Sequence, residues 1–190
     1  MPIDSDKLKA MKPPVGLPFN INKIGHVVLK VADMDRSVAF YTNVLGFKVS
    51  DVYTEDLAPG GMVFLRCAAD HHGVALVGNG AGDAAQSEMH HMAFEVTSID
   101  EVFRARKYLR EQQVKIDFHG RRRAGCQIAI EFHDPDGHHL EIYTSLDQVG
   151  SGGEVRPPED WKGVKSLEEA IDNPVENQLA ALQDQSLRED

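Results

Sequence analysis

Cysteine, basic charge and long apolar runs are all scarce in this 190-residue sequence. Cys67 and Cys126, the two cysteines, each lie inside an apolar, strand-like run, which favours buried thiols in a reducing compartment over a disulfide or a zinc knuckle. No run approaches the roughly 18 apolar residues that a membrane span requires. The N-terminus, rich in Pro and Lys, has no apolar core of the signal-peptide type. We therefore expect a cytoplasmic protein without a membrane segment.

The net charge of −10 disfavours nucleic acid and anionic lipid as partners. The basic cluster of the chain is the run of three arginines at residues 121–123, beside a turn expected after Gly120. We interpret this cluster as a solvated loop, with a loop that steers an anionic substrate as the alternative.

An internal repeat organises the chain. A shift of 65 residues pairs residues 24–35 (IGHVVLKVADMD) with residues 89–100 (MHHMAFEVTSID), so that His26 meets His91. The same shift places Leu76 on Glu141. Each first strand therefore carries a histidine, whereas the last strand carries a carboxylate in the second copy alone.

Hydrophobic periodicity and turn residues predict one strand, one helix and three more strands in each copy. The expected strands cover residues 23–31, 47–53, 62–67, 73–77, 89–96, 114–118, 127–132 and 138–143. A helix capped by Asp33 or Asp35 runs to about Leu45, and a helix over 98–110 starts at a Ser98 capping box. A second capping box at Ser166 predicts a short helix to about residue 172, and residues 175–190 form one more short helix or fray.

Residues 128–144 (IAIEFHDPDGHHLEIYT) predict a strand, a tight turn and a strand, because Asp134-Pro135-Asp136-Gly137 combines a proline with a glycine. In the second strand Leu140 and Ile142 share one face, so Glu141 lies on the other face. A carboxylate in the middle of a strand needs a partner. His26 and His91, which occupy equivalent positions in the two copies, complete with Glu141 the donor set of a facial triad for a divalent metal.

Three segments, GHVVLKVADMDRSVAFYTNVLGF, HMAFEV and DPDGHHLE, resemble the vicinal oxygen chelate superfamily, and the resemblance covers about residues 22–146. It implies an α+β fold in which two paired βαβββ modules form a cup-shaped half-barrel of mixed sheet around a metal, here with a C-terminal extension. The corresponding division of the chain is an N-terminal arm, a first module, a linker, a second module and a C-terminal arm, over residues 1–21, 22–79, 80–88, 89–146 and 147–190.

The resemblance also suggests a reaction. Glyoxalase I-like members use four protein ligands, but Leu76 occupies the fourth place here and a hydrocarbon cannot coordinate. Three ligands leave three positions of an octahedron open, which suits a chelating substrate and dioxygen. The chain is therefore most similar to the one-domain type I extradiol dioxygenases, which cleave a catechol-type ring with O2. Fe(II) is the expected ion and Mn(II) the alternative, and a homodimer or higher homo-oligomer is expected.

Further residues are carried over from the same family. In this family a histidine near the metal but not bound to it belongs to a His-His pair before the last strand of the first module. His72 corresponds to this histidine. We therefore expect His72 to have an acid-base role on the cup face, and the alternative is a histidine that only forms part of a turn. Glu131 stands where the two-domain enzymes have a tyrosine, and His119 is the histidine near it. Glu131, His119, His139 and Tyr143 are the candidates for the substrate pocket.

Two other functions share this fold. A fosfomycin-resistance transferase holds Mn(II) with the same three ligands and adds a thiol to an epoxide, but such enzymes end soon after the DPDGHHLE strand, whereas this chain continues over residues 147–190. A binding protein of the bleomycin-sequestering kind keeps the cup without a metal, and the complete set of ligands argues against it. Isomerases and epimerases have lower weight because most are expected to use a fourth ligand or an extra carboxylate.

Overall fold

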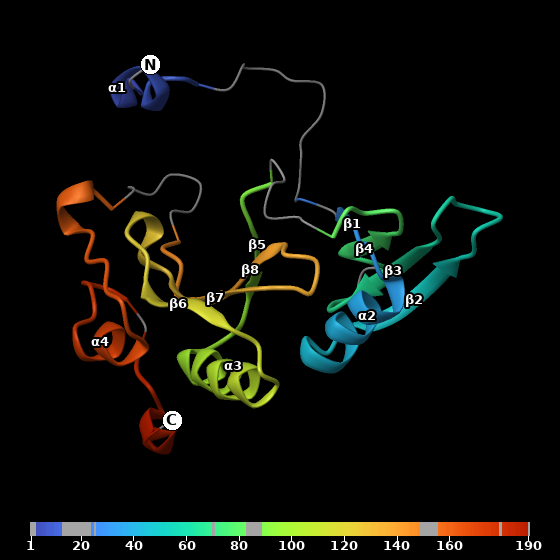
Figure 1. Cartoon of the computed structure of the whole chain (residues 1–190). Helices are drawn as coiled ribbons and strands as arrows, with labels where there is room; N and C mark the ends of the chain where they lie inside the picture. The colour runs from blue at the N-terminus through green and yellow to red at the C-terminus, as the bar shows by residue number, and fades with distance from the viewer. Residues whose placement is uncertain are drawn as a thin grey trace.

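The computed structural model describes residues 3–12, 24, 26–69, 71–82, 89–148, 156–178 and 180–189 (Figure 1). Within these residues the strands form two four-stranded mixed sheets, with the orders β1-β4-β3-β2 and β5-β8-β7-β6. Most of the N-terminal arm after Lys12, and residues 83–88 of the predicted linker, lie outside the described residues. The expected α+β fold class, with two βαβββ units and an open sheet, is confirmed.

The first sheet and its helix follow the predicted order. The elements are β1 (Val27–Lys30), α2 (Met34–Ala39), the π-helical turn η1 (Phe40–Val44), β2 (Lys48–Tyr53), β3 (Met62–Arg66) and β4 (Val74–Val77). The side chain of Asp33 caps α2 by accepting a hydrogen bond from the Arg36 N–H at 3.0 Å. Gly46 follows the helix with a φ of +73°, a left-handed conformation that favours glycine.

The second sheet repeats this arrangement with a longer helix. Its elements are β5 (Met92–Glu95), α3 (Ile99–Glu111), β6 (Ile116–Arg121), the short 3-10 turn η3 (Ala124–Cys126), β7 (Ile128–His133) and β8 (His139–Thr144). Ser98 caps α3 through a hydrogen bond from the Glu101 N–H, as its capping box predicted. Each module thus closes by pairing its first strand with its last strand in parallel.

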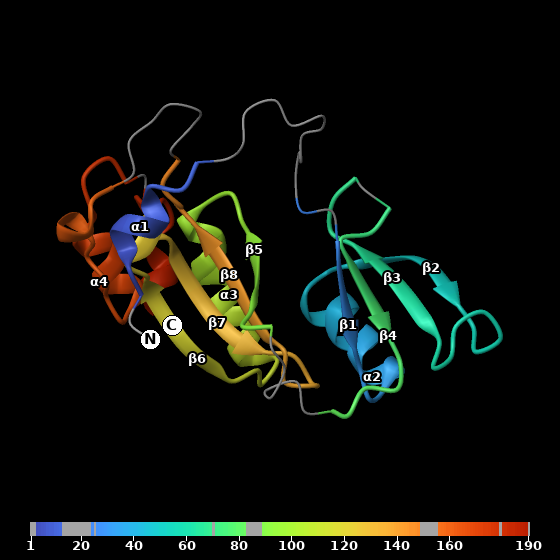
Figure 2. The same ribbon diagram turned by 90° about the horizontal axis from the view of Figure 1, so that it is seen from above.

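Both module helices cover the same side of the sheets, which leaves the opposite side open (Figure 1). Figure 2 shows β1 and β5 along the facing edges of the two sheets. The first strand is covered on one face only among the described residues. Leu29 is 3 % exposed on the helix side, whereas Val28 is 46 % exposed on the other side, because no second layer covers that side among the described residues.

The register of the last strands corrects one prediction. Val28 pairs with Ala75 in the first sheet, and Ala93 pairs with Glu141 in the second. The repeat is therefore offset by 65 residues in the first strands but by 66 in the last strands, and the position equivalent to Glu141 is Ala75 instead of Leu76. Leu76 is fully buried on the helix side. A methyl group coordinates no better than an isobutyl group, so the inferred absence of a fourth ligand still holds.

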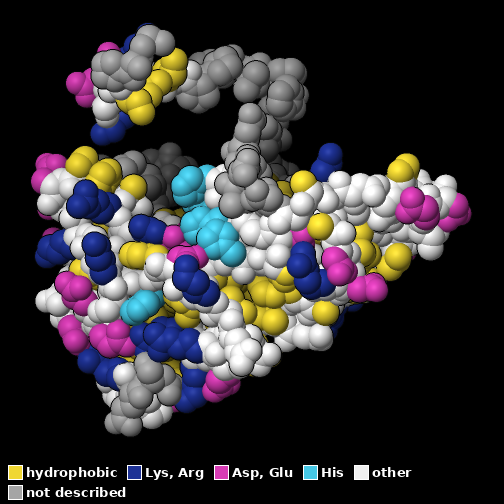
Figure 3. All heavy atoms as spheres, viewed as in Figure 1, with side chains coloured by type: hydrophobic (Ala, Val, Ile, Leu, Met, Phe, Trp, Pro, Cys, Tyr) yellow, Lys and Arg dark blue, Asp and Glu magenta, His cyan; other side chains and the backbone are white. Residues whose placement is uncertain are grey.

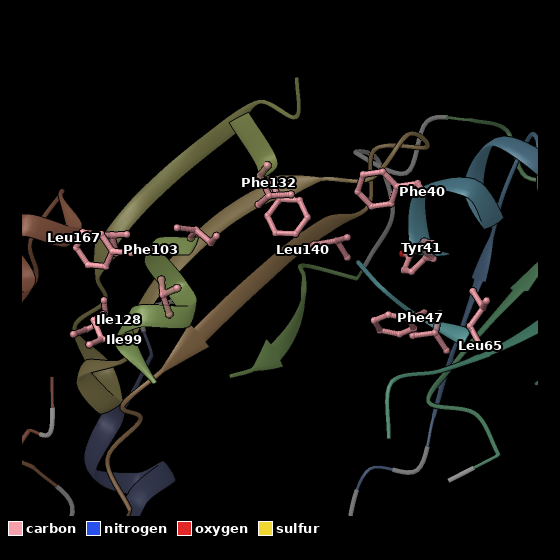
Figure 4. Packing of buried hydrophobic residues seen from close by; sticks show 14 of the residues in the cluster. Phe40, Tyr41, Phe47, Leu65, Ile99, Phe103, Ile128, Phe132, Leu140 and Leu167 are labelled. Carbon is pink, nitrogen blue, oxygen red and sulfur yellow. The ribbon is translucent and has the colours of Figure 1, made fainter. Parts of the chain in front are cut away.

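The core joins the two modules (Figure 4). The Phe47 ring lies 5.5 Å from that of Phe94, edge to face, across the boundary between the modules. Figure 4 shows Phe40 and Tyr41 of the first module facing Phe132 and Leu140 of the second. These contacts join the two modules through one shared hydrophobic core.

The C-terminal arm packs on the second module. It contains η4 (Pro158–Asp160), α4 (Leu167–Asp172) and η5 (Gln185–Glu189), and Ser166 caps α4 as predicted. Within the predicted segment 175–190, residues 185–189 form the short 3-10 helix η5, whereas residues 175–182, as far as they are described, form no helix. Leu167 and Leu182 nevertheless belong to the buried core. The arm is therefore part of the folded body.

Arg121 binds the C-terminal arm to the second module. The prediction of a solvated loop at the arginine cluster was wrong for this residue, which ends β6 and is 1 % exposed. Its guanidinium donates to the carbonyl oxygens of Lys162 at 2.9 Å and Asn173 at 2.7 Å, and to that of Ala170. A cation buried in this way is stable because carbonyl oxygens replace its lost water.

The two cysteines and the N-terminal arm differ in how they are buried. Cys126 is buried, but Cys67 is exposed, because it follows the end of β3 instead of lying within the strand. The short helix α1 (Ser5–Lys9) in the N-terminal arm has no buried residue. Among the described residues no helix is long and apolar enough to cross a membrane.

Candidate metal centre

Two of the three predicted metal ligands meet on the open face of the second sheet. The His91 Nε2 atom lies 3.4 Å from the Glu141 Oε2 atom, and the Glu141 side chain is 3 % exposed. The Gln127 side-chain amide donates to the other carboxylate oxygen, Oε1, at 2.8 Å. Because Oε1 is held by Gln127, Oε2 remains directed towards His91. With metal–ligand bonds of about 2.1 Å, two ligand atoms at right angles stand about 3 Å apart, so this pair has nearly the spacing of two ligands of one ion.

The third predicted ligand, His26, lies beside His72 on the open face of the first sheet. The two rings are 4.6 Å apart between centroids, and His72 also packs edge-on against Phe64 at 4.9 Å. Partial burial, together with the neighbouring His26 and His71, lowers the pKa of His72 below its ordinary value. The neutral imidazole is therefore the favoured form of His72 at neutral pH.

Strand alternation does not explain the position of His72 on this face. If alternation extended from β4 back to His72, this residue would share a face with Val74 and Leu76, which are buried on the helix side. His72 precedes β4 and Gly73, where the period of two does not apply. Its contacts with Phe64 and His26 place it on the open face.

A second group of possible ligands overlaps the first. His90, His91 and His139 have ligand atoms within 4.8 Å of one another, and among the described residues no other group of three or more His, Cys, Asp or Glu side chains is this close. His26 and Glu141 are not in this group. Figure 3 shows histidine side chains gathered beside acidic ones on one face of the molecule. His91 can therefore belong to either of two donor sets. The first set includes Glu141, and the second includes His139.

A cavity of about 700 Å³ opens beside this group, and its lining includes Glu131 and His139. Glu131, which is 6 % exposed, pairs across the strands with Glu141. The Arg122 guanidinium binds the Glu131 carboxylate through two nitrogens, with Nε at 2.6 Å from Oε1, and lies 3.7 Å above the Phe118 ring. His139 Nε2 is 3.2 Å from Glu131 Oε2. Arg122 thus compensates the charge of Glu131 beside the predicted metal ligand.

The remaining pocket candidates divide between the two faces of the sheet. Tyr143 pairs with Ala129 and shares the open face with Glu141, and burial, then the charges of Glu95 and Glu141, raise its pKa. His119 lies on the other face, where its Nδ1 accepts a hydrogen bond from the Leu167 N–H at 3.4 Å. Burial, then Arg106, lowers the pKa of His119. The structure therefore places His119 against the C-terminal arm and away from the cavity.

Sequence reasoning did not find Gln127, Arg122 or His90 as members of this site. Gln127 and Arg122 reach it across neighbouring strands, so that their spacing from Glu141 and Glu131 depends on the turn between β6 and β7. His90 is adjacent to His91 in the sequence, and this pair was a usable signal, since the similar pair His71-His72 was noticed.

The residues of this site lie within a segment that matches a known protein family. A family model described as the Glyoxalase/Bleomycin resistance protein/Dioxygenase superfamily matches residues 23–142. The chain belongs to this superfamily. The match includes both modules and all three predicted ligands, and the resemblance inferred from the three sequence segments is confirmed.

Curated relatives from the superfamily include ring-diol dioxygenases and a transferase. Biphenyl-2,3-diol 1,2-dioxygenase of Paraburkholderia xenovorans (strain LB400) is 40 % identical over 82 residues, which cover 42 % of this chain and 26 % of that protein. Metallothiol transferase FosB of Lysinibacillus sphaericus (strain C3-41) is 29 % identical over 134 residues, which cover 68 % of this chain and 87 % of the transferase. The chain thus spans between about a quarter and just under half of the length of the dioxygenases that it matches.

Solved structures show the same fold at lower identity. A glyoxylase/bleomycin resistance protein/dioxygenase domain from Frankia sp. EAN1pec superposes with a TM-score of 0.56 and 20 % identity, covering 66 % of this chain and 98 % of that domain. Described elements of the C-terminal arm lie outside the family match, which ends at residue 142.

Proposed function

We propose that this protein is an extradiol dioxygenase that cleaves a catechol-type ring with O2 at an Fe(II) ion held by His26, His91 and Glu141, with Mn(II) as the alternative ion. The observation that carries the proposal is the pair formed by His91 and Glu141. A nearly buried carboxylate points one oxygen at an imidazole, and the equivalent position of the first module is Ala75, which supplies no fourth ligand. The 40 % identity to a biphenyl-diol dioxygenase supports the reaction class.

The donor set fits the ion. Two imidazoles and one carboxylate form the set that non-haem Fe(II) oxygenases use, and three protein ligands leave room for a bidentate diol and a gas molecule. The ion would supply a Lewis acid that binds both reactants side by side and carries electron density between them. In the structure His26 lies against His72, and its ligand atoms belong to no group of three or more described ligands within 4.8 Å of one another.

The residues around the ion have separate tasks. Gln127 orients the Glu141 carboxylate by holding Oε1. The cavity beside Glu131 provides space for the ring and its substituent, and its Phe118 and Phe40 side chains offer apolar contacts. Arg122 holds the Glu131 carboxylate in place at the wall of the cavity, where its oxygens can accept hydrogen bonds.

The test is a reaction with a panel of catechols after anaerobic purification and loading with Fe(II). The expected result is uptake of one O2 per diol and a yellow ring-cleaved product. Absence of O2 uptake with every diol, from protein shown to contain iron, would reject the proposed reaction. The assay should include a bicyclic diol, since one relative acts on biphenyl-2,3-diol by its name.

His72 gives a sharper prediction about the same reaction. Its neutral imidazole beside His26 is placed to hold and move a proton near the substrate. His72→Gln is expected to lower kcat by about 100-fold, the lower end of the effect of general acid-base groups, while iron content stays within experimental error of the wild type. His71→Gln, which changes the adjacent exposed ring, is the matched control. Unchanged kcat in the His72 variant would remove this residue from the reaction.

One observation favours a second function. The metallothiol transferase FosB aligns over 87 % of its own length, whereas the dioxygenase match covers 26 % of its relative. A Mn(II)-dependent addition of a thiol to an epoxide uses the same donor set and needs no O2. Fosfomycin with Mn(II) and a thiol should therefore be assayed beside the catechols. Product formed without O2 uptake would favour the transferase.

A further inference from the structure

The turn between β7 and β8 reaches from the second module into the first. Asp136 is 1 % exposed, although it belongs to a turn, where charged side chains normally face water. Its carboxylate accepts three hydrogen bonds: from the Ala32 N–H at 2.9 Å, from the Arg36 Nη2 at 3.2 Å and from the Ser37 hydroxyl at 2.5 Å. All three donors belong to the first module. Asp136 therefore binds the end of the His26 strand and the first turn of α2.

A second aspartate gives the turn its shape. The Asp134 Oδ1 atom accepts hydrogen bonds from the backbone N–H groups of Asp136 at 3.0 Å and His138 at 2.9 Å. Its Oδ2 atom lies 2.8 Å from His138 Nδ1 and accepts a hydrogen bond from the Tyr41 hydroxyl at 3.1 Å. Burial, then the charge of Asp134, raises the pKa of Tyr41, so the hydroxyl remains a donor. The bonds within the turn fix its shape, and the bond from Tyr41 adds a second contact with the first module.

We propose that Asp136 is a positioning residue, which sets where His26 of the first module stands relative to His91 and Glu141 of the second. This inference rests on the proposed function insofar as His26 is a ligand. Ala32 is bound by Asp136 directly and continues the strand that starts after His26, and Gly137 and His138 separate Asp136 from the strand of Glu141. The two parts of the divided ligand set therefore share one rigid joint.

Strand geometry shows why this joint matters. Ala32 lies six positions after His26, which is about 20 Å of extended chain. A rotation of roughly 5° at Ala32 would displace His26 by about 2 Å, and displacements of about 1 Å already impair a site. Another contact between the modules, from the Tyr108 hydroxyl to the Asn43 carbonyl oxygen, binds a part of the first module outside the His26 strand.

The test compares Asp136→Ala and Asp136→Asn in the full chain. Asn keeps an oxygen for the Ala32 N–H but loses the charge that faces Arg36, so it should rescue part of the effect. The matched control is Asp100→Asn, because Asp100 is also a buried carboxylate (5 % exposed) that accepts backbone hydrogen bonds, from Gln183 and Asp184, but contacts no residue of the first module in these bonds.

The first readout is metal binding. Titration with Mn(II) alone, followed by electron paramagnetic resonance, is expected to show affinity about tenfold weaker in Asp136→Ala, as for loss of a residue that orients a ligand, and an intermediate value in Asp136→Asn. The second readout needs no metal. A spin label on the exposed Cys67 and another at Glu111→Cys, on the exposed end of α3, report the distance between the modules, while Cys126 is buried. This distance distribution should broaden in Asp136→Ala and stay narrow in Asp100→Asn.

The outcomes separate the two proposals. A narrow distribution and wild-type Mn(II) affinity in folded Asp136→Ala would overturn the positioning role. A wild-type chain that binds Mn(II) but transforms no diol would reject the proposed reaction and leave the positioning role standing. A wild-type chain that binds no Mn(II) would overturn the role towards the metal. If Asp136→Ala does not fold, Ser37→Ala removes one cross-module bond and should give the same changes at smaller size.

Discussion

Glu141→Gln is expected to lower the affinity for Fe(II) and Mn(II) by at least about 100-fold, which exceeds the 10–100-fold effect of losing a group that merely orients a ligand, and to abolish ring cleavage. The amide has nearly the shape of the carboxylate but lacks its negative charge. Gln127 now donates to Oε1 and the side chain is 3 % exposed, so a neutral group in this place leaves His91 without an anionic partner. Metal analysis after dialysis measures the loss.

The control and the rival variant make this prediction specific. Glu95→Gln alters an exposed carboxylate of β5 and should leave metal affinity unchanged. His139→Gln removes one imidazole of the group formed by His90, His91 and His139. If Glu141→Gln keeps its metal and His139→Gln loses it, the ion is held by the three histidines, and the facial triad with His26 is wrong.

Arg121→Met is expected to destabilise the protein by about 3 kcal/mol, because it leaves buried carbonyl oxygens without a charged donor. For a chain of this size that loss lowers the melting temperature by about 6–12 °C. The affected oxygens belong to Lys162, Ala170 and Asn173, so the C-terminal arm should also become sensitive to proteases. Calorimetry and limited trypsin digestion measure the two effects.

Arg123→Met is the matched control for this prediction, since Arg123 lies two residues further along and is exposed. It should change the melting temperature by little. Equal stability of the two variants would show that the arm is held by its apolar residues, such as Leu167 and Leu182, without help from the cation.

The fold was largely predictable because local signals agreed with it. Asp33, Ser98 and Ser166 each cap the helix that their sequence context predicted. Alternation placed Glu141 and Tyr143 on the open face of β8 correctly, since the strand lies between a core and water. These features depend on neighbours a few residues apart, which the sequence displays directly.

Errors arose where distant segments decide the outcome. Leu76 was aligned with Glu141 by a constant shift, but α3 and the connections between the strands differ in length between the modules, so the offset drifts by one residue in the last strand. One residue of drift exchanges the two faces of a strand. Arg121 was taken for a loop residue because the carbonyl oxygens that solvate it come from positions 41 to 52 residues later in the chain.

The residue types of the candidate metal ligands could be predicted from the sequence, but the side chains that bind these ligands could not. His91 and Glu141 were predicted from chemistry and strand position, and the structure places their side chains 3.4 Å apart. Arg122 and Gln127 were not predicted. They reach Glu131 and Glu141 only through the pairing of neighbouring strands, and the residues next to them in the sequence do not indicate these contacts. His119 was a pocket candidate through the family resemblance alone, but it pairs with Ile130 on the helix side of β6, after the bulge between Ile116 and Phe118.

The parallel pairing of first and last strands has a consequence for synthesis on the ribosome. Val27 pairs with Val74, and Met92 pairs with Leu140, so each unit closes only when its final segment has emerged. The hairpin of β7 and β8 can form early from adjacent residues, whereas β1 and β5 must wait for partners almost 50 residues downstream. The first half can therefore complete its sheet during translation of the second, and the joint at Asp136 can form as soon as the β7–β8 hairpin has emerged.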